Sequence, residues 1–145
     1  MKRRLTCLLA FIIGIASLTT AYAQDVVGTW KTIDDNTGKV RSHVEIYKEG
    51  GLVYGKIVKL VDPKEPNPIC DKCKGDDKDK PVVGLVIIKG LEKDDDEYSG
   101  GKILDPENGK LYKCYISLED PDKLKVRGYI GISLLGRTQY WQRLK

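Results

Sequence analysis

The alternation of strands and turns is clearest in residues 97–131, which read EYSGGKILDPENGKLYKCYISLEDPDKLKVRGYIG. Three segments rich in β-forming residues are separated by Asp105-Pro106-Glu107-Asn108-Gly109 and by Asp120-Pro121-Asp122. Both connections have the composition of tight turns, and Gly109 can adopt the positive φ that closes a short hairpin. The segment therefore predicts three consecutive antiparallel strands.

Apolar and polar side chains alternate along these strands and along residues 40–47. One face carries Val40, Ser42, Val44, Ile46, Leu124, Val126, Gly128 and Ile130. The opposite face carries Arg41, His43, Glu45, Tyr47, Lys123, Lys125, Arg127 and Tyr129. Strands with one apolar face fit a closed barrel that has an apolar interior and a solvated exterior.

The same pattern extends over the rest of the chain and gives eight strands in a single domain over residues 24–145. We expect the strands at residues 27–33, 40–48, 52–61, 82–91, 97–104, 110–119, 123–131 and 134–144. Short turns between consecutive strands favour an up-and-down order over a Greek key. The sequence thus predicts an all-β, antiparallel, up-and-down eight-stranded barrel, whose bore side chains can just fill or which can hold one small ligand.

Residues 1–23 have the three parts of a cleaved secretory signal. Basic residues at positions 2–4 precede an apolar run over residues 5–18, and the small-x-small triplet Ala21-Tyr22-Ala23 follows. The run is too short for a membrane anchor, so we expect cleavage after Ala23 and a periplasmic or secreted product. No other stretch is long and apolar enough to predict a membrane span in the mature chain.

Removal of the leader changes the charge balance. The whole chain has 25 Lys and Arg against 21 Asp and Glu, and three of the basic residues lie in the leader, which leaves 22 against 21. Nucleic-acid binding relies on a clustered excess of basic side chains. The mature chain has no such excess, so a nucleic-acid partner is not expected.

Three cysteines remain after the leader: Cys70, Cys73 and Cys114. In an oxidising compartment we expect one disulfide and one remaining thiol. A bridge from Cys70 or Cys73 to Cys114 closes a long loop and stabilises by about 4 kcal/mol, against about 2 kcal/mol for a bridge between Cys70 and Cys73. This comparison favours a bridge to Cys114. The alternative pairs Cys70 with Cys73 and leaves Cys114 as a buried apolar thiol.

The cysteines also support a third class of function, a metal- or thiol-dependent protein. Zinc would need four ligands, which Cys70, Cys73, Cys114 and His43 could supply together. However, His43 falls on the polar face of its strand, and no serine lies in a Gly-x-Ser-x-Gly elbow. We therefore predict no catalytic residue, no cofactor and no metal.

The segment before the last strand has an unusual composition. Residues 129–136 read YIGISLLG and should contain a hairpin connection, yet they are apolar. Either the segment folds inward and plugs one end of the barrel, or it leaves an exposed apolar patch of Ile132, Leu134 and Leu135 for a partner or a membrane surface. We favour the plug.

Gly28-Thr29-Trp30, together with Arg143, resembles the Gly-x-Trp and terminal Arg pair of lipocalin-like (calycin-type) barrels, in which the cation lies over the indole ring at the closed end. Over residues 28–144 the chain is also similar to a secreted bacterial family, domain of unknown function 2147. The resemblance is carried by Gly28-Thr29-Trp30, residues 81–84, residues 100–106, Gly109, Tyr112, Cys114 and VRGYIGISLLGRTQYW at 126–141. It implies an exported lipocalin-like barrel, a fold that by itself assigns no ligand or reaction.

Together these features predict an exported, noncatalytic binding module for a small apolar or amphipathic ligand held in the bore. The candidate ligand-binding residues are the aromatic side chains Trp30, Tyr54, Tyr112, Tyr129 and Trp141. The alternative is a structural or protein-interaction barrel of the cell envelope, with a filled bore and a partner bound at the apolar segment.

Overall fold

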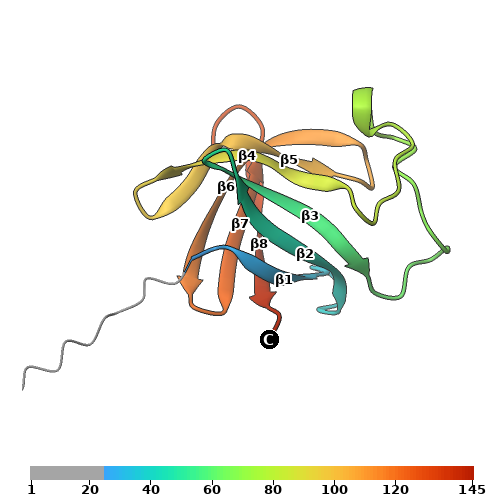
Figure 1. Ribbon diagram of the computed structural model, residues 1–145, viewed down its shortest axis with the longest axis horizontal. Coiled ribbons are helices and arrows are strands. Elements are labelled where there is room, and N and C mark those ends of the chain that lie inside the picture. The colour runs from blue at the N-terminus through green and yellow to red at the C-terminus, as the bar shows by residue number, and fades with distance from the viewer. Residues whose placement is uncertain (1–24) are drawn as a thin grey trace, which may run out of the picture.

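Eight strands make up nearly all of the regular structure in the computed structural model, which describes residues 25–145 (Figure 1). The strands are β1 (Gly28–Ile33), β2 (Val40–Glu49), β3 (Leu52–Leu60), β4 (Val86–Asp94), β5 (Glu97–Asp105), β6 (Lys110–Asp120), β7 (Lys123–Tyr129) and β8 (Gly136–Arg143). A short 3-10 helix, η1 (Gly75–Asp77), lies between β3 and β4. The predicted signal peptide lies outside the described residues.

Each strand pairs antiparallel with the next one in the chain, and β8 returns to pair with β1, so the sheet closes on itself. At the closing seam Trp30 on β1 lies opposite Arg143 on β8. This is the all-β, up-and-down, eight-stranded lipocalin-like barrel that the sequence predicts. Over residues 25–145, no helix has the length and apolar character needed to cross a bilayer.

The interior of the barrel is built from the alternating apolar positions. Val44 and Ile46 on β2 are fully buried, as are Leu124 on β7 and Ile116 on β6. Because neighbouring strands are paired in register, residues directly opposite each other share a face. Side chains such as Lys123 and Arg127 therefore lie on the outer surface, as the alternation predicts.

The barrel has two different ends. Residues 25–27 and the turns at residues 50–51, 95–96 and 121–122 lie at the end where β8 stops, which we call the Arg143 end. The other four connections, at residues 34–39, 61–85, 106–109 and 130–135, lie at the opposite end, the loop end. In Figure 1 the long connection between β3 and β4, drawn in green, stands out from the barrel at the right of the view.

Strand β4 begins at Val86 and not at residue 82, where we expected it. The backbone turns just before the strand, because Leu85 donates a hydrogen bond to Val82 and Gly84 has φ of +96°. Ile87, which points away from the barrel interior, is nevertheless only 6% exposed. Ile87 belongs to the same buried cluster as Val82, Leu85, Cys70 and Cys73 of the long connection between β3 and β4.

Candidate functional site

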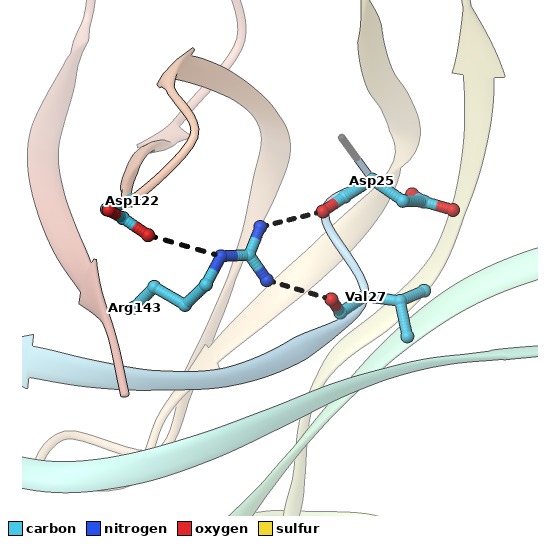
Figure 2. A pocket seen from close by; sticks show the side chains of 4 residues that line it. All are labelled: Asp25, Val27, Asp122 and Arg143. Carbon is cyan, nitrogen blue, oxygen red and sulfur yellow. Dashed lines mark hydrogen bonds and ion pairs between the residues drawn. The ribbon is translucent and has the colours of Figure 1, made fainter. Parts of the chain in front are cut away.

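At the Arg143 end, a single arginine links the first and last segments of the barrel. The guanidinium carbon of Arg143 lies 4.2 Å from the centre of a Trp30 ring. Its three nitrogens donate to the carbonyl oxygens of Asp25, Val27 and Pro121 at 2.8, 3.0 and 2.8 Å. Figure 2 shows the guanidinium held between the N-terminal segment and Asp122. The structure thus pairs Trp30 with Arg143 as a structural clasp.

A shallow hollow of about 280 Å³ lies beside this clasp. Asp25, Val27, Asp122 and Arg143 line it. Each nitrogen of the arginine already donates to a backbone carbonyl, and the side chain of Asp25 is bonded to Lys48 and Tyr98. The polar groups that line the hollow are therefore already bonded within the protein.

Both tryptophans of the predicted ligand site lie deep in the barrel. Trp30 and Trp141 are 0% and 2% exposed. Their indole nitrogens donate to the Val26 carbonyl oxygen at 2.8 Å and to the side-chain oxygen of Gln139 at 3.1 Å. The two side chains are thus packed and hydrogen-bonded within the protein itself, as expected of buried tryptophans.

Two of the predicted ligand-binding tyrosines do not face the bore, and this part of the prediction is wrong. Tyr54 lies on the outer surface of β3, where its ring stacks on that of Tyr47 at 5.8 Å. Tyr129 lies on the outer surface of β7 and packs against Tyr115 at 6.3 Å. In each strand the buried neighbours, such as Val53 and Val126, occupy the inward positions, so the alternation directs the tyrosines outward.

Tyr112 points inward near the rim of the loop end. It lies opposite Ile103 on β5, whose partner on β4 is the buried Ile88. Its hydroxyl accepts a hydrogen bond from the Asn108 side chain at 2.9 Å. Of the three tyrosines proposed from sequence, it is the one whose position faces the barrel interior.

The disulfide joins Cys70 to Cys73, with Cα atoms 5.3 Å apart, and the expected bridge to Cys114 is wrong. Cys114 points into the barrel and is 1% exposed, whereas the long loop lies outside the strands. The barrel wall therefore separates Cys114 from the other two cysteines. Burial raises the pKa of the Cys114 thiol to about 12, which keeps it protonated and unreactive.

These positions also bear on the metal hypothesis. The disulfide occupies two of the four proposed zinc ligands, Cys114 lies in the interior, and His43 is on the outer face of β2 opposite Lys31. Within residues 25–145 no three or more His, Cys, Asp or Glu side chains are grouped so that they could hold a metal. The structure does not bring the proposed ligands together.

The disulfide-bearing loop packs against the outside of the sheet. Asp77 of η1 forms an ion pair with Lys89 on β4 at 2.7 Å. Leu104, on the outer face of β5, is only 3% exposed. Gly109 marks the closest approach, because a Cβ atom there would lie 1.9 Å from the Lys72 carbonyl oxygen. The loop and the β5–β6 turn therefore lie side by side at the loop end.

Between them is a groove of about 450 Å³, which we call the rim groove. Its walls combine apolar side chains with lysines, and its lining is Lys72, Lys74, Asp77, Leu104, Asn108, Gly109, Lys110, Leu111, Tyr112 and Ile130. Asp77 forms ion pairs with Lys80 and Lys89, two lysines that do not line the groove. The ion pairs among residues 25–145 include none of Lys72, Lys74 or Lys110. The groove thus offers ammonium groups next to apolar surface.

The β7–β8 loop, residues 130–135, does not plug the barrel, and that expectation is wrong. Ile132, Leu134 and Leu135 are 60%, 82% and 66% exposed. The loop closes on itself, because Ile130 donates to the Leu135 carbonyl and Leu135 to that of Ile132. The loop therefore lies outside the barrel as an apolar patch.

The groove was not predicted, because its residues come from distant parts of the sequence. The disulfide loop supplies Lys72 and Lys74, whereas the β5–β6 hairpin supplies Lys110, Leu111 and Tyr112. The signal that could have located it is the glycine of the β5–β6 turn, since a close contact at that position requires a neighbouring segment.

Comparison with known proteins agrees with this architecture. A family model described as "Uncharacterized protein conserved in bacteria (DUF2147)" matches residues 28–143. A solved structure, that of protein HP1028 from the human pathogen Helicobacter pylori, which belongs to the lipocalin family, superposes with a TM-score of 0.74 at 22% identity and covers 84% of each chain. A comparison with curated protein sequences gave no significant match. The family match spans most of the chain, from the Gly-x-Trp triplet to the clasp arginine, and the protein therefore belongs to the DUF2147 family.

Proposed function

We propose that the protein is an exported, noncatalytic binding module that takes an amphipathic anion in the rim groove. The observation that carries this proposal is the composition of the groove, in which Lys72, Lys74 and Lys110 adjoin Leu111, Tyr112 and Ile130. Its volume of about 450 Å³ falls within the range of small-molecule sites. The lipocalin-like fold supports a binding role.

The proposal moves the ligand from the bore to the rim. The bore residues Trp30 and Trp141 are buried and have their polar atoms satisfied. At the rim, by contrast, Leu111 is 49% exposed and Ile130 65% exposed. Covering this apolar surface with an alkyl chain is favourable by about 25 cal/mol per Å², and a carboxylate or sulfate head would accept charge-assisted hydrogen bonds from the lysines.

Isothermal titration calorimetry with dodecanoate tests the proposal. Lys110→Glu and Leu111→Ser should each weaken binding about tenfold. The first removes a cation that would bind the carboxylate head of dodecanoate, and the second removes apolar contact with its alkyl chain. Lys59→Glu, an exposed lysine on β3 away from the groove, is the matched control and should bind as the wild type does. Equal affinity of all three variants, or no binding by the wild type, would refute the rim site.

The exported location is part of the same proposal and rests on the leader sequence alone. Mass spectrometry of the protein isolated from its own host should give a chain that begins at Gln24. A chain that retains residues 1–23 would contradict cleavage.

A further inference from the structure

The β7–β8 loop presents a concentrated apolar surface to solvent. Four of its six residues are large and apolar, and Leu134, at 82% exposed, is the most exposed large hydrophobic residue among residues 25–145. Its shape is fixed by internal hydrogen bonds and by Arg127, whose Nε donates to the Ser133 carbonyl at 2.7 Å. In Figure 1 the loop arches away from the strands at the top of the view.

Cationic side chains surround the base of this loop. Lys113 donates to the Gly131 carbonyl at 3.2 Å, and Arg127 holds the Ser133 carbonyl. Arg137 follows the loop directly at the start of β8 and pairs with Asp35. On the other side, Ile130 shares the rim groove with Lys72, Lys74 and Lys110, where the carboxylate of Asp77 is already paired with Lys89. The base of the apolar loop therefore carries the cations Lys113 and Arg127.

We propose that the β7–β8 loop docks the barrel on an anionic lipid bilayer. Leu134 and Leu135 insert among the acyl chains, and Lys113 and the lysines of the rim groove face the phosphate groups. Apolar side chains flanked by Lys and Arg are the combination that holds peripheral proteins at such a surface. A second copy of the chain fits less well, because a symmetric contact through the loop would bring the same cations together. The proposal does not depend on the ligand of the rim groove.

Co-sedimentation with vesicles tests this proposal. The wild type should bind vesicles of phosphatidylglycerol and phosphatidylethanolamine, bind phosphatidylcholine vesicles more weakly, and lose affinity as the salt concentration rises. Leu134→Asp and Leu135→Asp should each weaken binding about tenfold or more, since each removes the burial of one leucine. Lys113→Glu should weaken binding to anionic vesicles more than to phosphatidylcholine vesicles.

Controls separate docking from folding and from ligand binding. Leu144→Asp changes an apolar residue that is 39% exposed at the Arg143 end, and it should bind vesicles as the wild type does. Thermal unfolding should show that Leu134→Asp remains folded, and Leu134→Gln provides a milder second variant. Dodecanoate affinity of Leu134→Asp should stay unchanged, so failure of the rim site and failure of docking are distinguishable. Undiminished vesicle binding by both leucine variants, no binding by the wild type, or binding only to a protein partner would overturn the proposal.

Discussion

Arg143 connects several segments at one end of the barrel through its side chain. Its guanidinium makes three hydrogen bonds to backbone carbonyls of two different segments and lies over the Trp30 ring. The side chain is 20% exposed, so these contacts are partly shielded from water. A short N-terminal segment and the last strand are thereby joined by one side chain.

Replacing this side chain should destabilise the fold. Arg143→Ala removes the charged hydrogen bonds and the cation–π contact, and we expect a loss of about 2–4 kcal/mol in the free energy of unfolding. Urea denaturation measures the loss. Arg137→Ala is the control, because the Arg137 side chain is 61% exposed and forms a surface ion pair with Asp35. This substitution should lower the free energy of unfolding by less than about 1 kcal/mol. Equal losses for the two variants would contradict the clasp.

Asp25 gives the same end of the barrel a pH dependence. Partial burial raises the pKa of Asp25, but hydrogen bonds from Lys48 and Tyr98 outweigh burial and hold the pKa below its usual value of 3.8. The charged form is thus stabilised by folding, and its contribution is present above pH 3.8 and disappears as the pH falls through the lowered pKa.

Asp25→Asn should accordingly lower the melting temperature at pH 7 and match the wild type in strong acid. The effect is small, at most about 1 kcal/mol, because the side chain is 41% exposed. Thermal melts over a pH series measure it. In a Lys48→Met background the effect of Asp25→Asn should shrink, and a difference that persists unchanged into strong acid would exclude a titrating carboxylate as its cause.

At the scale of elements, the position of the long loop depends on the β5–β6 turn. Gly109 has φ of +70° and leaves no room for a Cβ atom against the Lys72 carbonyl. The close approach of these two segments forms one wall of the rim groove. A side chain at Gly109 would therefore disturb the turn and the loop together.

Gly109→Ala should destabilise the protein by about 2 kcal/mol or more, because it combines an unfavourable positive φ with a steric clash. Gly50→Ala is a matched control, since Gly50 has φ of +56° but a Cβ atom there would have no neighbour within 4 Å, and the substitution should cost about 1 kcal/mol. Chemical denaturation compares the two. The same cost at both positions would show that the loop does not press on the turn.

Strand alternation and turn composition were sufficient to predict the barrel, because each is a local property of the sequence. Alternation predicts which side chains of β2 and β7 point inward, and the short turns predict the order of the eight strands. The start of β4 was misplaced because the backbone turn at Gly84 depends on contacts with β3, such as the hydrogen bond from Gly84 to the Ile57 carbonyl.

Two expectations failed because they depend on contacts between distant segments, and a third failed although local alternation already contradicted it. Loop length alone favoured a bridge to Cys114, but the barrel wall separates the cysteines. Apolar composition favoured a plug at residues 130–135, but the large apolar side chains of this loop are exposed. Tyr54 and Tyr129 were proposed as ligand contacts for their aromatic character, although the alternation of their own strands already directs them outward.

On the scale of the whole molecule, the two ends of the barrel differ in structure. At the Arg143 end the arginine side chain donates hydrogen bonds to backbone carbonyls, whereas the loop end carries the disulfide loop, the rim groove and the exposed β7–β8 loop. The two sites proposed above, the rim groove and the β7–β8 loop, both lie at the loop end.

A crystal structure of the protein soaked with dodecanoate would locate the ligand and so decide between the rim and the bore. We expect the alkyl chain to lie on Leu111, Tyr112 and Ile130, with the carboxylate within hydrogen-bond distance of at least one groove lysine. A ligand found inside the barrel, in contact with Trp30 and Trp141, would refute the rim site and return the binding site to the bore.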